Sequence, residues 1–149
     1  MARVPIPSEA ERRVRDAARH RCGYCLSQQR YTMAKLTIEH IRPRSTFAPG
    51  DPAMHAEENL WLSCGFCNGH KSDKTHALDP ATGQEIALFN PRTQEWAGHS
   101  RWSEDGIRIV GVTATGRATV IALHLDDDPD ALAVRANWVS VGWHPPSDV

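Results

Sequence analysis

The chain has 149 residues, of which 40% are hydrophobic and 23% are charged, and it contains 10 Gly and 10 Pro. This length predicts one domain that can bury a core, and the Gly and Pro content predicts many turns. From length and composition we expect a small α+β protein. No apolar run is long enough for a signal segment or a membrane span, so we also expect a cytoplasmic protein that does not associate with membranes.

The formal net charge of −1 conceals an uneven distribution of charge along the chain. Residues 1–50 carry ten basic side chains against four acidic ones, and residues 51–149 carry seven against fourteen. The basic ten are Arg3, Arg12, Arg13, Arg15, Arg19, Arg21, Arg30, Lys35, Arg42 and Arg44. Clustered arginine favours a phosphate-backbone partner, because a local positive field steers association even when the net charge is small. A solvated helix face explains Arg12, Arg13 and Arg15 equally well.

The first predicted element is a helix that begins near Ser8. Ser8 can cap it, and Glu11, three residues further on, completes a capping box. A narrow apolar stripe follows at Ala10, Val14, Ala17 and Ala18. This spacing predicts a helix that ends near His20 and leads into the first cysteine pair.

All four cysteines fall into two C-x-x-C pairs, Cys22 with Cys25 and Cys64 with Cys67. In a reducing compartment such pairs indicate one zinc ion bound by four thiolates. Thioredoxin-like redox chemistry would require a C-x-x-C at a helix start in a βαβ unit, which the pattern lacks, and two disulfides would require export. Residues 26–63 separate the pairs, whereas a plain zinc ribbon separates them by roughly 15–20 residues. The insertion is longer than a structural zinc site requires.

The insertion contains two predicted strands and leads into a predicted helix. Residues 36–41 alternate in strand fashion and end before Pro43, which cannot donate to a ladder. Residues 59–63 form a second short strand, and residues 68–74 are predicted to be helical. Glu39 and His40 stand at the end of the first strand. A carboxylate beside an imidazole suits metal-assisted hydrolysis, because one binds a hard cation and the other activates water.

Residues 39–45, E-H-I-x-P-x-S, and 59–71, N-L-W-L-S-C-x-x-C-N-x-x-K, resemble the HNH endonuclease family. The likeness is to its zinc-stapled subgroup, which has a ββα-metal core of the HNH or His-Me finger type. It implies that His40 is the general base and that Glu39 and Asn68 bind a catalytic divalent ion. Asn59 would orient His40 through hydrogen bonds within the loop. Many members have Asp or His at the first ligand position and His at the second; the oxygen donors here favour Mg²⁺ or Mn²⁺.

The basic side chains around these motifs are candidates for nucleic-acid binding. Lys71 could reach the phosphate, although a solvated helix face is the alternative, and Arg42 and Arg44 could hold the flanking backbone. His70 is an alternative metal ligand, but the C-N-x-x-K register assigns that role to Asn68. The remaining histidines have no partner pattern and are assigned to the surface or the core: His55, His76, His99, His124 and His144.

Residues 77–149 are predicted to be a small β-rich extension of a core at about residues 8–76, within a single domain 1–149. We predict strands at 85–89 and 118–125, a hairpin through Asp105-Gly106, and a helix at 130–138. Asp126–Asp128 would cap that helix, with Pro129 at its first position, rather than bind an ion. The extension could cover the core, dock a partner, or contact DNA. The side chains available for DNA contact are Arg92, Arg101 and Arg117, with Trp96 and Trp102 for stacking.

The resemblance therefore implies a divalent-metal-dependent HNH endonuclease or nickase that hydrolyses DNA phosphodiester bonds and carries a separate structural zinc. No recognition helix is evident, so low intrinsic sequence specificity is expected. One such centre cuts one strand per event, and double-strand cleavage would require a homodimer or two encounters. A partner protein could supply the targeting. The alternative is a non-catalytic zinc-binding module that docks nucleic acid or protein within a larger assembly.

Overall fold

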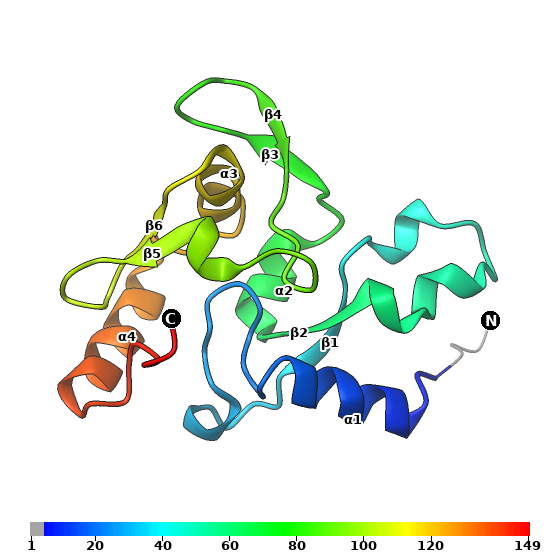
Figure 1. Ribbon diagram of the computed structural model, residues 1–149, viewed down its shortest axis with the longest axis horizontal. Helices are drawn as coiled ribbons and strands as arrows, with labels where there is room; N and C mark the ends of the chain where they lie inside the picture. The colour runs from blue at the N-terminus through cyan, green and yellow to red at the C-terminus, as the bar shows by residue number, and fades with distance from the viewer. Residues whose placement is uncertain (1–4) are drawn as a thin grey trace.

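The computed structural model describes residues 5–149, so Arg3 lies outside the described residues (Figure 1). The helices are α1 (Ser8–Ala17), α2 (Gly65–Lys71), α3 (Ala114–Ala122) and α4 (Pro129–Ser140). The strands pair as three antiparallel hairpins, β1 (Thr37–His40) with β2 (Leu60–Ser63), β3 (His76–Leu78) with β4 (Glu85–Ala87), and β5 (Ser100–Trp102) with β6 (Ile109–Gly111). This mixture confirms the α+β class. Within the described residues, no helix has the length and apolar character that a membrane crossing requires.

The predicted first helix is present, but its predicted capping box is not. Pro7 is the residue before the helix, and no side chain caps the first turn. The Glu11 carboxylate instead pairs with Arg15 one turn further on, at 2.9 Å. The buried Val14 and Ala18 face the protein interior, where Ala18 packs with Leu36 and Leu62. Apolar contact therefore holds α1 against the β1–β2 hairpin.

The β1–β2 hairpin and α2 form the predicted ββα unit. Glu39 is opposite Trp61 and His40 is opposite Leu60 in the ladder. Because successive side chains of a strand point to opposite faces, Glu39 is buried while His40 is half-buried on the other face. The helix begins earlier than predicted, directly after Cys64, whose sulfur accepts a hydrogen bond from the Cys67 N–H.

The extension packs against the first C-x-x-C loop. Figure 1 shows the β3–β4 and β5–β6 hairpins and α3 grouped together, away from α1. The core they share with the loop contains Tyr24, Phe89, Ile109, Leu123 and Leu125. The Trp96 indole N–H also donates to the Tyr24 carbonyl at 2.9 Å. The loop and the extension therefore have one hydrophobic core in common.

The predicted strand at 118–125 is wrong, because α3 occupies most of this segment. An apolar run of this length is ambiguous between strand and helix. Thr113 caps the helix by accepting from the Gly116 N–H at 3.1 Å. Gly116 packs so closely against the His99 carbonyl that no side chain would fit. The local cap and the long-range contact accompany the helix, so the extension has two helices beside its hairpins.

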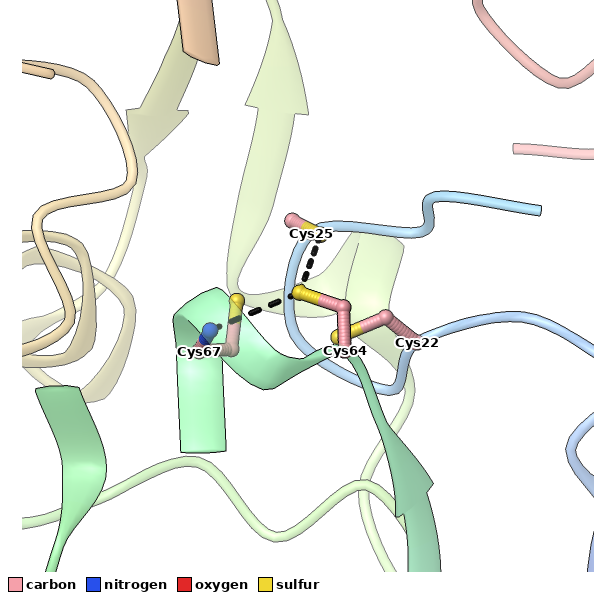
Figure 2. A group of neighbouring side chains, drawn as sticks. All are labelled: Cys22, Cys25, Cys64 and Cys67. Carbon is pink, nitrogen blue, oxygen red and sulfur yellow. Dashed lines mark hydrogen bonds between the residues drawn. The ribbon is translucent and has the colours of Figure 1, made fainter. Parts of the chain in front are cut away.

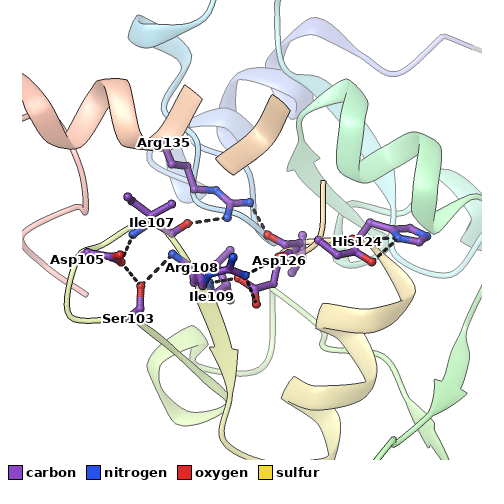
Figure 3. Close-up of polar contacts among 10 residues, drawn as sticks. Ser103, Asp105, Ile107, Arg108, Ile109, His124, Asp126 and Arg135 are labelled. Atoms are coloured by element: carbon purple, nitrogen blue, oxygen red, sulfur yellow. Dashed lines mark hydrogen bonds and ion pairs between the residues drawn. The ribbon is translucent and has the colours of Figure 1, made fainter. Parts of the chain in front are cut away.

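The acidic run before α4 makes contacts within the fold, and Figure 3 shows those of Asp126. Of its three residues, Asp128 alone has the predicted capping role. Asp128 accepts from the Ala131 N–H at 2.9 Å and caps α4, with Pro129 at the first helical position. Asp126 accepts from the Ile109 N–H at 3.1 Å. In the predicted hairpin between β5 and β6, Gly106 adopts a φ of 75°, which suits glycine at a turn.

Two of the three arginines proposed to touch DNA from the extension are engaged within the fold. Arg117 makes two bonds to the buried Asp79 carboxylate, at 2.8 and 2.9 Å, and holds the pKa of Asp79 well below its usual range. Arg92 donates to the Leu60 carbonyl and lies over the Trp61 ring. Arg101 is exposed. These contacts favour structural cover as the role of this part of the extension.

Candidate zinc and active sites

The structure brings the four cysteine sulfurs together, all within 4.8 Å of one another (Figure 2). Cys22 and Cys25 come from the loop after α1, while Cys64 and Cys67 come from the start of α2. Among residues 5–149, this is the single group of three or more His, Cys, Asp or Glu side chains with ligand atoms so close. Backbone N–H groups point at two of the sulfurs, as Figure 2 shows for Cys64.

The donor set fits a zinc ion. The Cys25 and Cys64 sulfurs lie 3.7 Å apart, and tetrahedral Zn–S bonds place sulfurs about 3.8 Å apart. Burial raises the pKa of Cys22 well above that of a free thiol. A bound cation would favour the thiolate form of Cys22, and its binding would release the thiol proton.

Cys64→Ser is expected to lower both zinc content and thermal stability, because a structural zinc contributes its binding free energy to folding. Zinc per chain and the melting temperature would be measured on the same purified protein. Ser8→Ala is the matched control, since Ser8 is exposed and makes no capping bond. A Cys64→Ser protein that binds zinc and melts like the parent would contradict the four-thiolate site.

His40 lies in a short chain of hydrogen bonds between His55 and Arg44. The His40 Nε2 and His55 Nδ1 atoms are 3.0 Å apart, and Arg44 Nε donates to His40 Nδ1 at 3.5 Å. Because Arg44 can only donate, His40 Nδ1 accepts, which places the proton of the neutral ring on Nε2, toward His55. Burial, followed by the charge of Arg44, lowers the pKa of His40 to about 4. The ring is therefore neutral at pH 7, with its lone pair on Nδ1.

A cavity of about 340 Å³ lies beside His40. Its lining includes three predicted site residues, His40, Arg44 and Asn68. Asn68 is exposed on α2, and Arg44 is exposed in the loop after β1. A basic side chain, a neutral imidazole and an amide thus face one solvent-accessible space.

Asn59 makes the hydrogen bonds within the loop that its motif position implies. Its side-chain oxygen accepts from the Arg42 N–H at 2.8 Å, and its amide nitrogen donates to the Arg42 and Met54 carbonyls. Its backbone carbonyl accepts from the Ile41 N–H. These bonds hold the two residues that directly follow His40.

Lys71 is not available to a phosphate, which corrects the sequence prediction. Its side chain is 3% exposed, and its ammonium group contacts Glu39 Oε1 at 3.0 Å. The same group donates to the carbonyls of Ile41 and His40, at 2.9 and 3.3 Å. An ammonium group has three donors, and these partners use all of them. Lys71 therefore supports the backbone at His40 from inside the protein.

Glu39 does not line the cavity that His40 shares with Asn68. Its Oε1 atom accepts from the Tyr24 hydroxyl at 2.9 Å and from Lys71. Burial raises the pKa of Glu39, although the charge of Lys71 opposes this. Its Oε2 atom is buried and has no hydrogen-bond partner among the described residues. This oxygen and the Asn68 amide oxygen are donors of the kind that Mg²⁺ or Mn²⁺ prefers. Asn68 lines the cavity and Glu39 does not, so the structure does not bring the two predicted ligands together in that space.

The other predicted candidates lie apart from the cavity. Arg42 donates to the Thr46 hydroxyl and carbonyl and lies 4.1 Å from the Phe47 ring centroid, so its guanidinium is tied to its own loop. His70 packs against the rings of Phe66 and His124. Neither Arg42 nor His70 lines the space beside His40.

His55 is a site residue that the sequence reasoning missed, because it was assigned to the surface or core. It ends the 3₁₀ turn Pro52–His55, which Asp51 caps by accepting from the Ala53 N–H at 2.9 Å. Asp51-Pro52 marks a turn in the sequence, but no pattern there shows that the turn folds back onto His40. Tyr24 was missed for the same reason, since its bond to Glu39 joins separate parts of the chain.

Comparison with protein families confirms the resemblance. The model of the HNH endonuclease family matches residues 22–74. Residues 22–74 therefore match the HNH endonuclease family, and the four clustered cysteines are consistent with its zinc-stapled kind. No curated protein and no solved structure matches the chain.

Proposed function

We propose that the protein is a divalent-metal-dependent endonuclease or nickase that hydrolyses DNA phosphodiester bonds, with a separate structural zinc. The observation that carries the proposal is the cavity in which neutral His40 meets Arg44 and Asn68 within an HNH domain. A neutral imidazole can accept a proton from water, and a guanidinium beside it can bind the phosphate that the water attacks.

His40 is the proposed general base, acting through the Nδ1 lone pair once Arg44, which donates to Nδ1 in this structure, turns to the phosphate. Arg44 binds a phosphate oxygen and keeps His40 unprotonated through its charge. Glu39 Oε2 and Asn68 would hold the divalent ion, and the ion would stabilise the negative charge that develops on the phosphate and the leaving oxygen. Because the protein offers two ligands, such an ion keeps coordination positions for water and phosphate.

Asn59, Lys71 and His55 are proposed as positioning residues. Asn59 and Lys71 both form hydrogen bonds with the backbone at residues 40–42. With Arg44 donating to His40 Nδ1, His55 Nδ1 accepts a hydrogen bond from the His40 Nε2–H, which keeps the lone pair of His40 on Nδ1. The base is then held in one tautomer and one orientation before substrate arrives.

The test of this function is nicking of supercoiled plasmid by the zinc-loaded protein with Mg²⁺ or Mn²⁺, and without either ion. Metal-dependent formation of nicked circles is expected, since one centre cuts one strand per event. A folded, zinc-loaded protein that cuts neither plasmid nor single-stranded DNA would contradict an autonomous nuclease. A partner subunit, or a non-catalytic docking role, would then be the explanation to pursue.

His55→Ala is expected to lower the nicking rate by about 10–100-fold, because the imidazole of His40 loses the partner that fixes its orientation. His55→Asn is expected to restore much of the rate, since an amide oxygen can take the place of Nδ1 as acceptor. The two variants would be compared at saturating plasmid, with zinc content as a check on folding. Equal nicking rates for the His55→Ala and His55→Asn variants would show that His55 acts through packing and not through its hydrogen bond.

A further inference from the structure

A second basic and aromatic surface lies apart from the His40 cavity. It surrounds a hollow of about 330 Å³ between the loop after α1 and the segment after α4. Its charged and aromatic lining residues form what we call the Arg-Trp surface: Arg19, Arg21, Arg30, Tyr31, Trp143 and Asp148. None of them lines the cavity beside His40.

The aromatic part of the Arg-Trp surface is a stacked pair with an exposed outer ring. The Tyr31 and Trp143 centroids are 4.6 Å apart, and their planes differ by 13°. Arg30 lies 5.0 Å from the Tyr31 centroid, and Trp143 is 48% exposed. A parallel pair of rings beside a guanidinium is the kind of platform on which an unpaired base stacks.

The charged part of the surface already binds a carboxylate. Asp148 accepts from Arg19 Nη1 at 2.6 Å and from the two terminal nitrogens of Arg21 at 2.9 and 3.1 Å. Two guanidinium groups that converge on one pair of oxygens form the arrangement that also binds phosphate. Asp148 therefore occupies the position that a phosphate group would take.

The backbone that presents these arginines is held in an unusual conformation. Arg19 and His20, just beyond α1, have φ angles of 55° and 54°. Non-glycine residues in this left-handed region are strained and are concentrated at functional sites. Here the two residues turn the chain so that Arg19 and Arg21 reach the same carboxylate.

We propose that the Arg-Trp surface binds single-stranded DNA, with a base stacked on Trp143 and its phosphate between Arg19 and Arg21 in place of Asp148. The inference rests on the proposed nucleic-acid substrate, but it does not require cleavage. Asp148 competes with the phosphate, so the surface has reduced affinity until the segment that carries Asp148 is displaced. The exposed ring favours a nucleobase over an acidic peptide, which would use the arginines alone.

The test is binding of a fluorescent oligothymidine of about 12 nucleotides to the full-length, zinc-loaded His40→Ala protein, without added Mg²⁺. Trp143→Ala is expected to weaken binding about 5–100-fold, the range for loss of one base–aromatic stack. Asp148→Asn is expected to tighten binding, because it frees the two guanidinium groups. Val141→Ala, at an exposed neighbouring position, is the control that should bind like the parent.

Because Asp148→Asn should gain affinity, the test does not depend on whether Trp143→Ala folds. If Asp148→Asn binds no more tightly and a zinc-loaded Trp143→Ala binds as the parent does, the proposal is wrong. Tighter binding of polyglutamate than of oligothymidine would assign the surface to an acidic protein partner instead. If the protein nicks plasmid normally and neither Trp143→Ala nor Asp148→Asn changes oligothymidine affinity, this inference alone is refuted. If both variants change the affinity as expected but the protein does not nick plasmid, the nuclease proposal alone is refuted.

Discussion

His40→Ala is expected to lower the rate of plasmid nicking by about 10²–10⁴-fold, the usual contribution of a positioned general base. The expectation follows from the neutral ring, its Nδ1 lone pair, and its place beside Arg44 and Asn68. Zinc content and melting temperature should stay unchanged, because the half-buried side chain lies apart from the cysteine cluster. The measurement is the initial rate of conversion of supercoiled to nicked plasmid in Mg²⁺.

His76→Ala is the matched control for this variant. His76 is an exposed histidine at the start of β3, and its ring contacts the neighbouring Thr75 hydroxyl. Its replacement should leave nicking intact. If His40→Ala and His76→Ala both nicked plasmid at the parent rate, His40 would be excluded as the general base. Cleavage that continues without any added divalent ion would contradict the metal requirement.

The zinc ligands and the ββα unit were predictable because their signals are local. The spacing of the cysteines, the alternation of residues 36–41 and the turn at Asp105-Gly106 each depend on a few consecutive residues. The structure confirms the corresponding elements, namely the cysteine cluster, β1 and the β5–β6 hairpin. The family motif added the functional assignment of His40 and Asn68, which no periodicity could have supplied.

The wrong or missing predictions concern contacts between distant parts of the chain. Most of the segment at 118–125 is helical, and the helix that contains it packs through Gly116 against the backbone of His99, a contact that the apolar pattern cannot reveal. His55 reaches His40 only because its turn folds back across the long loop. Lys71 follows the motif register, yet the register does not say which face of α2 the side chain occupies. The Lys71 side chain lies on the face where it meets the Glu39 carboxylate and the carbonyls of His40 and Ile41.

Lys71→Met is expected to destabilise the protein by about 3–5 kcal/mol, the usual effect of removing one partner of a buried ion pair. The two side chains are 3% and 1% exposed, so the remaining Glu39 charge would have little water around it. The Tyr24 hydroxyl would be its one remaining donor. The free energy of unfolding in urea would be measured on zinc-loaded protein. Lys74→Met, at an exposed position in the same region, should change it by less than about 0.5 kcal/mol.

The double variant Glu39→Gln with Lys71→Met isolates the cause of this loss. Removing both charges is expected to recover much of the stability, because the cost comes from the uncompensated carboxylate rather than from lost packing. If the double variant were as unstable as Lys71→Met alone, packing and the bonds to the His40 and Ile41 carbonyls would account for the effect. The burial of Lys71 argues against a phosphate-binding role. If the Lys71→Met protein were as stable as the parent but bound DNA poorly, that role would be supported after all.

The pH dependence of the Lys71→Met defect follows from the same carboxylate. Burial already raises the pKa of Glu39 in the folded protein, and removing the charge of Lys71 would raise it further. A raised folded-state pKa favours folding at low pH, where the carboxyl group is protonated, and this advantage is lost as pH rises through that pKa. The difference in unfolding free energy between parent and variant should therefore be smaller near pH 5 than near pH 8. A difference independent of pH would show that Glu39 remains charged and hydrated in the variant.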